Sequence, residues 1–476
     1  MDPRSTTDEQ RSMPRVVVTG LGPVSAIGSG RDELWNALCA GRHGFGPITL
    51  CDPGDSPSKI AAEVKDFDLE RYVENGRILA RRMPRPVQLA FAASVLALHD
   101  SEIDLDACDP DRLGVFVGTS LGNVEELLEA HTGLQQGRSI PPTIAFNLFN
   151  HSAACTISSF FNIRGPVHTT TSGCNSGIDA LGQALRILQA GAADAMLVVG
   201  TDCEVVSEVM AALNASGSLA TRYNDAPERA SRPFDADRDG NVIGEGAAAL
   251  LLETEEHARR RKARIYARVT GYQICSAGQN RQYSHDAPEL DTQPAVRAFR
   301  GVLREAGWSP ADVDQVNANG SSSKIYDRLE ALALAEVFGD ALSEVRVSSI
   351  KSMLGQHGAG SSALQATTAC LTIRRREIPP TINHERPDPE MPPLRVVTAR
   401  ESVAPERVLV HAIGLGGFYY SVAGFEDPEI DGGGMSAAET GQGKVVWSVK
   451  GHPRFKPAPR FQKPLSPWRP RRDRAG

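Results

Sequence analysis

The sequence predicts an α/β fold that is duplicated within a single chain. Runs rich in β-branched and other apolar residues alternate with stretches in which apolar residues recur at helical spacing, as in alternating strands and helices. This alternation occurs twice, the second set beginning near residue 260, and each half closes on two adjacent strands. The duplication lies in the order of the elements, because the residues themselves do not repeat. We therefore expect two similar halves in one layered structure.

The first half contains four expected strands. Two β-branched runs, 15–22 and 112–120, end in glycine turns, while the nearly continuous apolar runs 193–202 and 246–254 are typical of strands buried on both faces. A helix is predicted over 176–191, "SGIDALGQALRILQAG", from its apolar spacing. In the second half, strands or strand–turns are expected over 263–274, 313–323, 344–355, 407–417 and 418–426, and helices over 292–307, 327–339 and 360–375.

The composition is that of an ordinary globular protein, with 41% hydrophobic and 23% charged residues. No apolar run is long enough to span a membrane, and the N-terminus has acids but no apolar core, so we expect no secretory signal and a cytoplasmic location. The eight cysteines lie far apart, without a Cys-x-x-Cys pair or clustered histidines. We therefore predict no zinc site, no disulfide framework and no cofactor.

The C-terminal tail differs from the rest of the chain. A glycine-rich linker follows residue 427, and the segment from Lys444 onward is proline-rich, with ten Lys and Arg against one acid, Asp473. Such a composition favours disorder. A solvated tail is the preferred interpretation over a contact with nucleic acid or a membrane. We predict disorder over 1–13 and 428–476, with folded halves over 14–257 and 258–427.

Three short patterns invite chemical interpretation. The glycines of 18–25 resemble a dinucleotide loop, but Pro23 interrupts the turn and Ser25 replaces the third glycine. Residues 118–122 match the Gly-x-Ser-x-Gly elbow of serine hydrolases, but such short patterns arise often by chance and a tight glycine turn is the preferred interpretation. Cys174 stands among small residues at an expected helix N-terminus, where amide N–H groups favour the thiolate. From these residues alone, a nucleophile and a buried structural cysteine remain equally supported.

Six segments resemble the β-ketoacyl-ACP synthase family of the thiolase superfamily, in the right order between about residues 14 and 426. The segments are "RVVVTGLGPVSAIGSG", "SGCNSGIDALGQA", "SRPFDADRDGNVIGEGAAALLLE", "VNANGSSSKIYDRLEA", "IKSMLGQHGAGSSALQA" and "IGLGG". The resemblance implies a thiolase-like, internally duplicated fold of α-β-α-β-α layers. It also implies an acyltransferase of the 3-oxoacyl-ACP synthase type.

The resemblance further implies roles for individual residues. Cys174 would take an acyl chain from an acyl carrier protein, and the N–H groups of Cys174 and Leu415, beside Gly416, would form the oxyanion hole. Lys351 and Glu330 would match a buried ion pair behind the site.

The chain departs from the family pattern where two histidines normally assist decarboxylation of a malonyl thioester. Asn319 replaces the first histidine, and Gln356 stands at the second position with His357 immediately after it. An amide can donate a hydrogen bond to an enolate oxygen but cannot carry a proton at neutral pH. Acid–base work would then fall to His357, provided that one extra loop residue moves it into the site; otherwise it points elsewhere.

Other departures lie along the implied substrate channel. Leu415 replaces a gating phenylalanine, Phe418 and Tyr419 replace a Thr-Asn pair, and Asn241 stands where an aromatic residue is common. These substitutions imply a reshaped pocket or drift in a chain that no longer condenses.

Three functions follow from these observations. The first is acyl loading onto Cys174 for decarboxylative condensation in fatty-acid or polyketide biosynthesis, or for transfer or cyclisation without elongation. The second is a non-catalytic partner subunit like a chain-length factor, and the third, a serine hydrolase, conflicts with the implied fold. The expected partners are acyl carrier protein and a second ketosynthase subunit, in a homodimer or heterodimer, without nucleic acid or membrane.

Overall fold

The computed structural model describes residues 13–278, 291–414 and 419–430. The predicted disordered ends, 1–13 and 428–476, lie outside the described residues apart from Met13 and 428–430. Leu415, Gly416 and Phe418, assigned to the oxyanion hole and channel, also lie outside them. Within the described ranges, no helix combines the length and the apolar character that crossing a membrane requires.

A mixed sheet of 12 strands forms the framework, and its strand order is mirrored about the pairing of β1 with β9. Three strands run parallel in the first half and four in the second, and in each half two antiparallel strands follow toward the centre. The twelfth strand, the short β2 (Gly28–Ser29), pairs with β1. From one edge, the first half contains β6 (Val167–Thr170), β5 (Leu113–Gly118), β7 (Ala195–Cys203), β8 (Glu245–Thr254) and β1 (Val16–Ser25). The second contains β9 (Ala267–Ser276), β16 (Tyr419–Glu426), β15 (Arg407–Ile413), β10 (Gln315–Asn317), β11 (Arg346–Ser348) and β13 (Arg395–Val396). The predicted duplication is confirmed in this order of strands.

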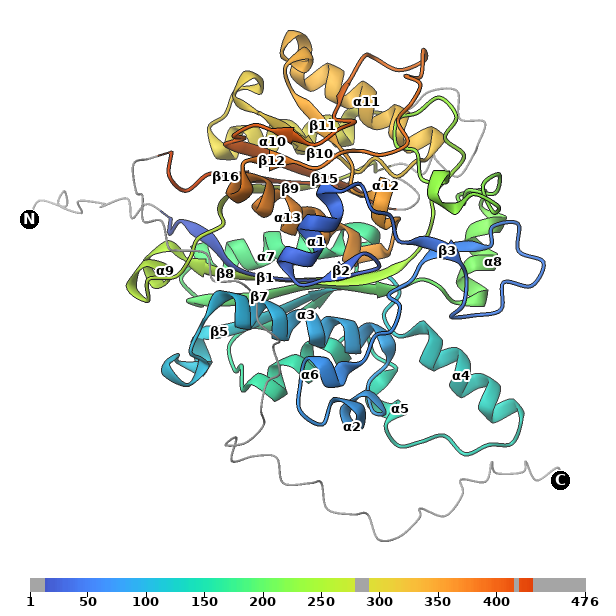
Figure 1. The fold of residues 1–476 in the computed structure, drawn as a ribbon. Helices are drawn as coiled ribbons and strands as arrows, with labels where there is room; N and C mark the ends of the chain where they lie inside the picture. The colour runs from blue at the N-terminus through green and yellow to red at the C-terminus, as the bar shows by residue number, and fades with distance from the viewer. Residues whose placement is uncertain (1–12, 279–290, 415–418, 431–476) are drawn as a thin grey trace, which may run out of the picture.

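Helices form three layers that alternate with the two halves of the sheet (Figure 1). The helices α7 (Ser176–Gln189) and α13 (Gly358–Arg375) pack together in the middle layer, where α13 buries every residue from Gly358 to Ile373. The first half is covered on its other face by α3 (Arg85–Ser101) and α6 (Ser152–Phe161), and the second by α10 (Gln293–Ala306) and α11 (Lys324–Phe338). The predicted α-β-α-β-α layering is therefore confirmed.

Two glycines allow the central helix to approach closely. A Cβ on Gly177 of α7 would lie 2.3 Å from the carbonyl oxygen of Ala359, and one on Gly200 of β7 would lie 2.5 Å from the same atom. Any larger residue would push α13 away from the start of α7, where Cys174 lies.

Shorter elements complete the described part of the chain. The helices are α1 (Arg31–Cys39), α2 (Gly76–Ala80), α4 (Val124–Gln135), α5 (Ile144–Asn147), α8 (Ser207–Ala215), α9 (Glu255–Arg260) and α12 (Lys351–Leu354). The strands are β2 (Gly28–Ser29), β3 (Phe45–Pro47), β4 (Ile60–Ala62), β12 (Glu377–Ile378) and β14 (Glu401–Ser402).

Candidate active site

Cys174 lies on the single 3-10 turn Gly173–Asn175, between the end of β6 and the start of α7. Gly173 has a φ of 68°, a left-handed conformation that glycine adopts without steric cost. Ser362 of α13 donates a hydrogen bond to the Cys174 carbonyl oxygen at 2.8 Å. The Asn175 amide donates to the Ala412 carbonyl at 3.1 Å and to Ser421 Oγ at 2.8 Å. The second half of the fold therefore fixes the turn that carries the thiol at the helix N-terminus.

A cavity of about 450 Å³ opens beside Cys174. It brings together four of the predicted site residues, Cys174, Asn241, Asn319 and Gln356, whereas Lys351, Glu330 and His357 do not line it. The remaining lining residues are Glu204, Leu213, Leu219, Ile243, Ser321, Tyr326 and Ile413.

The amide oxygen of Asn319 is already occupied by hydrogen bonds within the protein. Its Oδ1 atom accepts hydrogen bonds from Lys351 Nζ at 3.1 Å and from the Ile413 backbone N–H at 3.2 Å. No other described residue bonds to its Nδ2 atom. With the oxygen occupied, the NH2 group is the part of Asn319 that can donate to a substrate oxygen.

Glu330 and Lys351 contact Asn319 from two sides instead of forming the direct ion pair that the resemblance implies. Lys351 Nζ donates to the Asn319 carbonyl at 2.7 Å and to Gln365 Oε1 at 3.0 Å. Glu330 accepts the Asn319 backbone N–H at 2.8 Å. Burial lowers the pKa of Lys351 to about 8, although the negative charge of Glu330 opposes this shift. Both charges therefore act on the site by positioning Asn319.

His411 of β15 also belongs to this arrangement and was not predicted. Its Nδ1 atom lies 2.6 Å from Glu330 Oε1, and its ring is fully buried against Phe299. The sequence signal was weak, since a lone histidine in an apolar strand is most simply a core residue.

The structure distinguishes Gln356 from His357. The backbone of Gln356 pairs with the loop opposite, donating to Val242 O at 2.7 Å and accepting from Gly244 N at 2.9 Å. This pairing places the Gln356 side chain on the cavity wall, with Oε1 buried and unbonded by any described residue.

His357 instead occupies the core between β8 and α13. Its ring packs directly against both elements. A Cβ added to Gly246 of β8 would lie 3.0 Å from the ring, and one added to Gly360 of α13 would lie 2.8 Å from it. Burial, with a smaller contribution from the Lys351 charge, lowers the pKa of His357 to about 3, so the ring is neutral at physiological pH. Of the two placements considered from sequence, the structure shows the one in which His357 points elsewhere.

The Gly-x-Ser-x-Gly pattern forms a turn that a buried carboxylate holds in place. Asp202 accepts hydrogen bonds from the Ser120 N–H at 2.8 Å, the Leu121 N–H at 3.1 Å and the Thr119 hydroxyl at 2.7 Å. It also accepts the Ala359 N–H at 2.7 Å and so connects this turn to α13. Ser120 does not line the cavity of Cys174, which agrees with a structural role for the turn.

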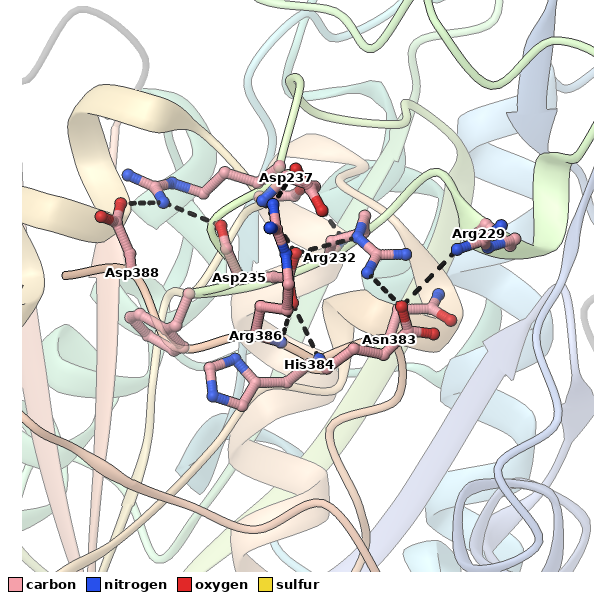
Figure 2. Close-up of polar contacts among 12 residues, drawn as sticks. Arg229, Arg232, Asp235, Asp237, Asn383, His384, Arg386 and Asp388 are labelled. Atoms are coloured by element: carbon pink, nitrogen blue, oxygen red, sulfur yellow. Dashed lines mark hydrogen bonds and ion pairs between the residues drawn. The ribbon is translucent and has the colours of Figure 1, made fainter.

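Figure 2 shows Asp235 at the centre of a polar network that joins the loop 229–238 to the segment 383–388. Asp235 accepts backbone N–H groups of Asp237, Glu385 and Arg386 at 2.7 to 2.8 Å and pairs with Arg232 at 3.2 Å. Burial would raise the pKa of Asp235, but these donors together hold it below its usual value.

The same loop supports the wall of the cavity. Ser231 Oγ donates to the Lys351 carbonyl at 2.7 Å, and the Arg232 N–H donates to Ser322 Oγ at 2.9 Å. The Phe234 N–H donates to Asp327 of α11 at 2.9 Å. The loop 229–238 therefore positions Lys351 and the loop that carries Asn319.

Sequence reasoning missed Glu204 and Tyr326, both of which line the cavity. Glu204 follows a buried strand and Tyr326 lies in the first turn of α11, so neither stands in a recognisable local motif. Among the described residues, no group of three or more His, Cys, Asp and Glu side chains is arranged to hold a metal ion.

Comparison with known proteins places this geometry in a family. Residues 13–258 match the model of the β-ketoacyl synthase N-terminal domain, and residues 266–385 match that of the C-terminal domain. The chain belongs to the β-ketoacyl synthase family. The predicted family, fold and acyltransferase class of this ketosynthase are thereby confirmed.

Relatives and solved structures support the assignment over most of the chain. The ketosynthase is 35% identical to a 3-oxoacyl-[acyl-carrier-protein] synthase 2 of Synechocystis sp., covering 86% of this chain and 97% of the relative. The solved ishigamide ketosynthase/chain length factor matches with a TM-score of 0.78 and 30% identity over 87% of this chain and 99% of that one. A type II polyketide synthase acyl carrier protein in complex with its ketosynthase bound to the hexaketide matches with a TM-score of 0.78 and 28% identity, covering 88% and 100%.

Proposed function

We propose that this ketosynthase carries an acyl chain on Cys174 and extends it by decarboxylative condensation, in fatty-acid or polyketide biosynthesis. The Cys174 thiolate attacks the thioester carbonyl of an acyl carrier protein, and the carrier thiol leaves as the Cys174 thioester forms. The proposal rests on one observation: the cavity that reaches Cys174 also contains Asn319, with its NH2 group oriented for donation.

In the second step, Asn319 takes the place of the family's first histidine. A malonyl thioester loses CO2, and the electron pair of the broken C–C bond generates an enolate. The Asn319 NH2 group stabilises that enolate oxygen as charge develops on it. The enolate carbon then forms a bond to the acyl carbonyl, and the Cys174 thiolate leaves. This sequence needs hydrogen-bond donors but no group that titrates near neutrality, which suits a cavity with Asn319 and Gln356.

A non-elongating ketosynthase, which only transfers or cyclises its acyl chain, is the second candidate. The observation that favours it is that neither Asn319 nor Gln356 can transfer a proton and that His357 does not line the cavity. A chain-length-factor-like role without catalysis is less well supported, because Cys174 is half-buried and reaches the cavity rather than packing in the core.

We also propose that the ketosynthase pairs with a second ketosynthase subunit in the cytoplasm. The edge strand β6 exposes Val167, and the α4–α5 region exposes a group of apolar side chains. Figure 1 shows α4 extending away from the layered body, with α5 near α2 at its base. The exposed residues are Leu127, Leu134, Ile140, Phe146 and Phe149. An open edge strand and an exposed apolar patch are surfaces that a partner subunit would cover. Whether that partner is a second copy, as in a homodimer, or a sister synthase can be tested by analytical ultracentrifugation.

Intact-protein mass spectrometry tests the acyl-transfer step. Incubation with acyl carrier protein loaded with an acyl chain is expected to add the mass of that chain, and Cys174→Ala should abolish the adduct. Cys155→Ala is the matched control, because Cys155 is an exposed thiol in the same half of the fold. Loss of the adduct in both variants, or in neither, would contradict the assignment. Release of CO2 from malonyl carrier protein, measured on the acylated protein, separates condensation from transfer alone.

A further inference from the structure

Glu204 is a carboxyl group without a partner in the wall of the Cys174 cavity. It directly follows β7, is 8% exposed, and lines the cavity beside the apolar residues Leu213, Leu219 and Ile243. No hydrogen bond or ion pair links its carboxyl group to another side chain or backbone group in the described ranges. A buried carboxyl group is costly unless a partner is supplied, so its retention in a cavity indicates a ligand.

The position of Glu204 is fixed by its own backbone. Its N–H donates to the Gly244 carbonyl at 3.3 Å, and its carbonyl accepts from the Val206 N–H at 2.9 Å. These bonds hold the backbone on both sides of the residue, so the side chain starts from a fixed point in the wall. The side chain is therefore presented to the cavity by the fold rather than by a flexible loop.

The surroundings of Glu204 favour its uncharged form. Burial raises the pKa of Glu204 well above its usual value, and the negative charge of Asp202 raises it further. The nearby cations are engaged elsewhere: Arg85 pairs with Glu245 at 2.5 Å and Lys351 bonds to Asn319 and Gln365. An uncharged carboxylic acid offers one O–H donor and one carbonyl acceptor.

Three further cavity residues bury polar oxygen atoms that no described residue bonds. These atoms are Asn241 Oδ1, Ser321 Oγ and Gln356 Oε1. A plain alkyl chain in this cavity would leave all of these groups unpaired and would cut them off from water. A chain with an oxygen substituent would satisfy Glu204, and a hydroxyl could also donate to an acceptor such as Asn241 Oδ1.

We infer that Glu204 is a specificity-determining residue, which selects acyl chains bearing a hydroxyl or keto oxygen by hydrogen-bonding that oxygen while the chain is attached to Cys174. The inference rests on the proposed acyl loading of Cys174 and names the substrate class of that step. A site built to bond a polar substituent discriminates strongly against the analogue that lacks it, because the buried group is then left unpaired.

The test is a competition between acyl thioesters of N-acetylcysteamine, measured by the rate of Cys174 adduct formation. Each pair has equal chain length and differs only by a hydroxyl or keto group, placed in turn along the chain. For at least one placement, the wild-type protein is expected to prefer the oxygenated chain by roughly tenfold or more. Glu204→Leu should remove this preference and accept the alkyl chain faster, whereas Glu204→Gln should retain much of it because an amide still donates.

Each result bears on a different claim. Equal rates for every pair in the wild type, or an unchanged preference in Glu204→Leu, would overturn the role of Glu204 while leaving acyl loading intact. A preference for a matched amino-acyl chain over the hydroxyl chain would also overturn it, since an ammonium requires an ionised Glu204. Absence of any Cys174 adduct with every donor would instead refute the proposed function itself, and the inference with it. Circular dichroism of both Glu204 variants confirms that the compared proteins are folded.

Discussion

The network around Asp235 and the cavity beside Cys174 are both built from buried polar groups, yet they are satisfied in opposite ways. Asp235 accepts three backbone N–H groups and one arginine, and only Nη1 of Arg232 is left without a bond among the described residues. In the cavity, oxygen atoms of Asn241, Ser321 and Gln356 have no such partner. Groups with internal partners hold a fold together, whereas buried groups without them await a ligand.

The same difference appears in the pKa values of Asp235 and Glu204. The pKa of Asp235 lies below its ordinary 3.8, so the folded state binds its proton more weakly than the unfolded chain. The pKa of Glu204 lies well above its ordinary 4.5, so the folded state binds that proton more tightly. The first carboxylate therefore stabilises the fold at neutral pH, and the second, if forced to ionise, destabilises it.

Removal of the central carboxylate from the network should give the largest loss of stability. Asp235→Ala removes the buried carboxylate beside Arg232, leaves that arginine paired with Glu385 alone, and strips three backbone N–H groups of their acceptor. It is expected to cost about 3–5 kcal/mol of unfolding free energy. The shift of the urea unfolding midpoint measures this loss, provided that the dependence of the unfolding free energy on urea concentration is the same in both proteins. Asp111→Ala, which removes an exposed pair with Arg164, is the matched control and should cost less than about 1 kcal/mol. Similar losses in the two variants would show that the network does not hold the fold.

Removal of a donor from the cavity should instead affect turnover most, with a smaller loss of stability because Lys351 Nζ and the Ile413 N–H lose one acceptor. Asn319→Ala takes away the NH2 group offered to the enolate and is expected to lower condensation about 10²–10³-fold. Acylation of Cys174 should persist, because that step does not use Asn319. Mass spectrometry of the adduct and release of CO2 from malonyl carrier protein measure the two steps separately. A loss of both steps in parallel would contradict this division of roles.

The neighbours Gln356 and His357 offer a smaller but sharper test. Gln356→Ala removes a cavity-lining amide and should lower turnover by about tenfold or more, as for a positioned polar group. His357→Gln alters a buried ring that does not reach the cavity, so its effect should appear in the melting temperature rather than in the ratio of turnover to acylation. If His357→Gln abolishes CO2 release in a folded protein, the histidine takes part in decarboxylation and the proposed division of roles is wrong.

The smallest expected effect is a difference between Asp235 and Glu204 in how their contributions to the unfolding free energy depend on pH. The stabilisation from Asp235 is complete above pH 3.8, the pKa in the unfolded chain, and is lost as the pH falls through its lower folded value. The stabilisation from the protonated Glu204 is complete below pH 4.5, the pKa in the unfolded chain. It is lost as the pH rises through the higher pKa of Glu204 in the folded protein. Glu204→Gln should therefore gain stability relative to wild type at alkaline pH, by about 1.4 kcal/mol for every pH unit by which the pKa of Glu204 in the folded protein exceeds that in the unfolded chain. Urea titrations at several pH values measure how the unfolding free energy of wild type and of Glu204→Gln depends on pH. Parallel plots of that free energy against pH for the two proteins would contradict the protonation assigned to Glu204.

The main strands and helices could be predicted from sequence because their apolar patterns are long and regular. The apolar runs that became β7 and β8, and the helices α7 and α13, lie close to their expected ranges. The edge strand β6 was missed because its residues are exposed or half-buried and show no apolar alternation. Short polar strands depend on their neighbours in the sheet, and this information is not local.

For the site, adjacent residues alone establish that Cys174 stands among small residues before an amphipathic helix. The family resemblance adds that Asn319 stands at the first histidine position, and that Gln356 and His357 are adjacent at the second. These are local facts, and no knowledge of the folded chain is needed to read them. The placement of Gln356 rather than His357 at the cavity came from the folded chain, since it depends on backbone pairing with residues 242–244. The orientation of the Asn319 amide and the isolation of Glu204 arose in the same way, because their partners and neighbours come from segments far away in the chain.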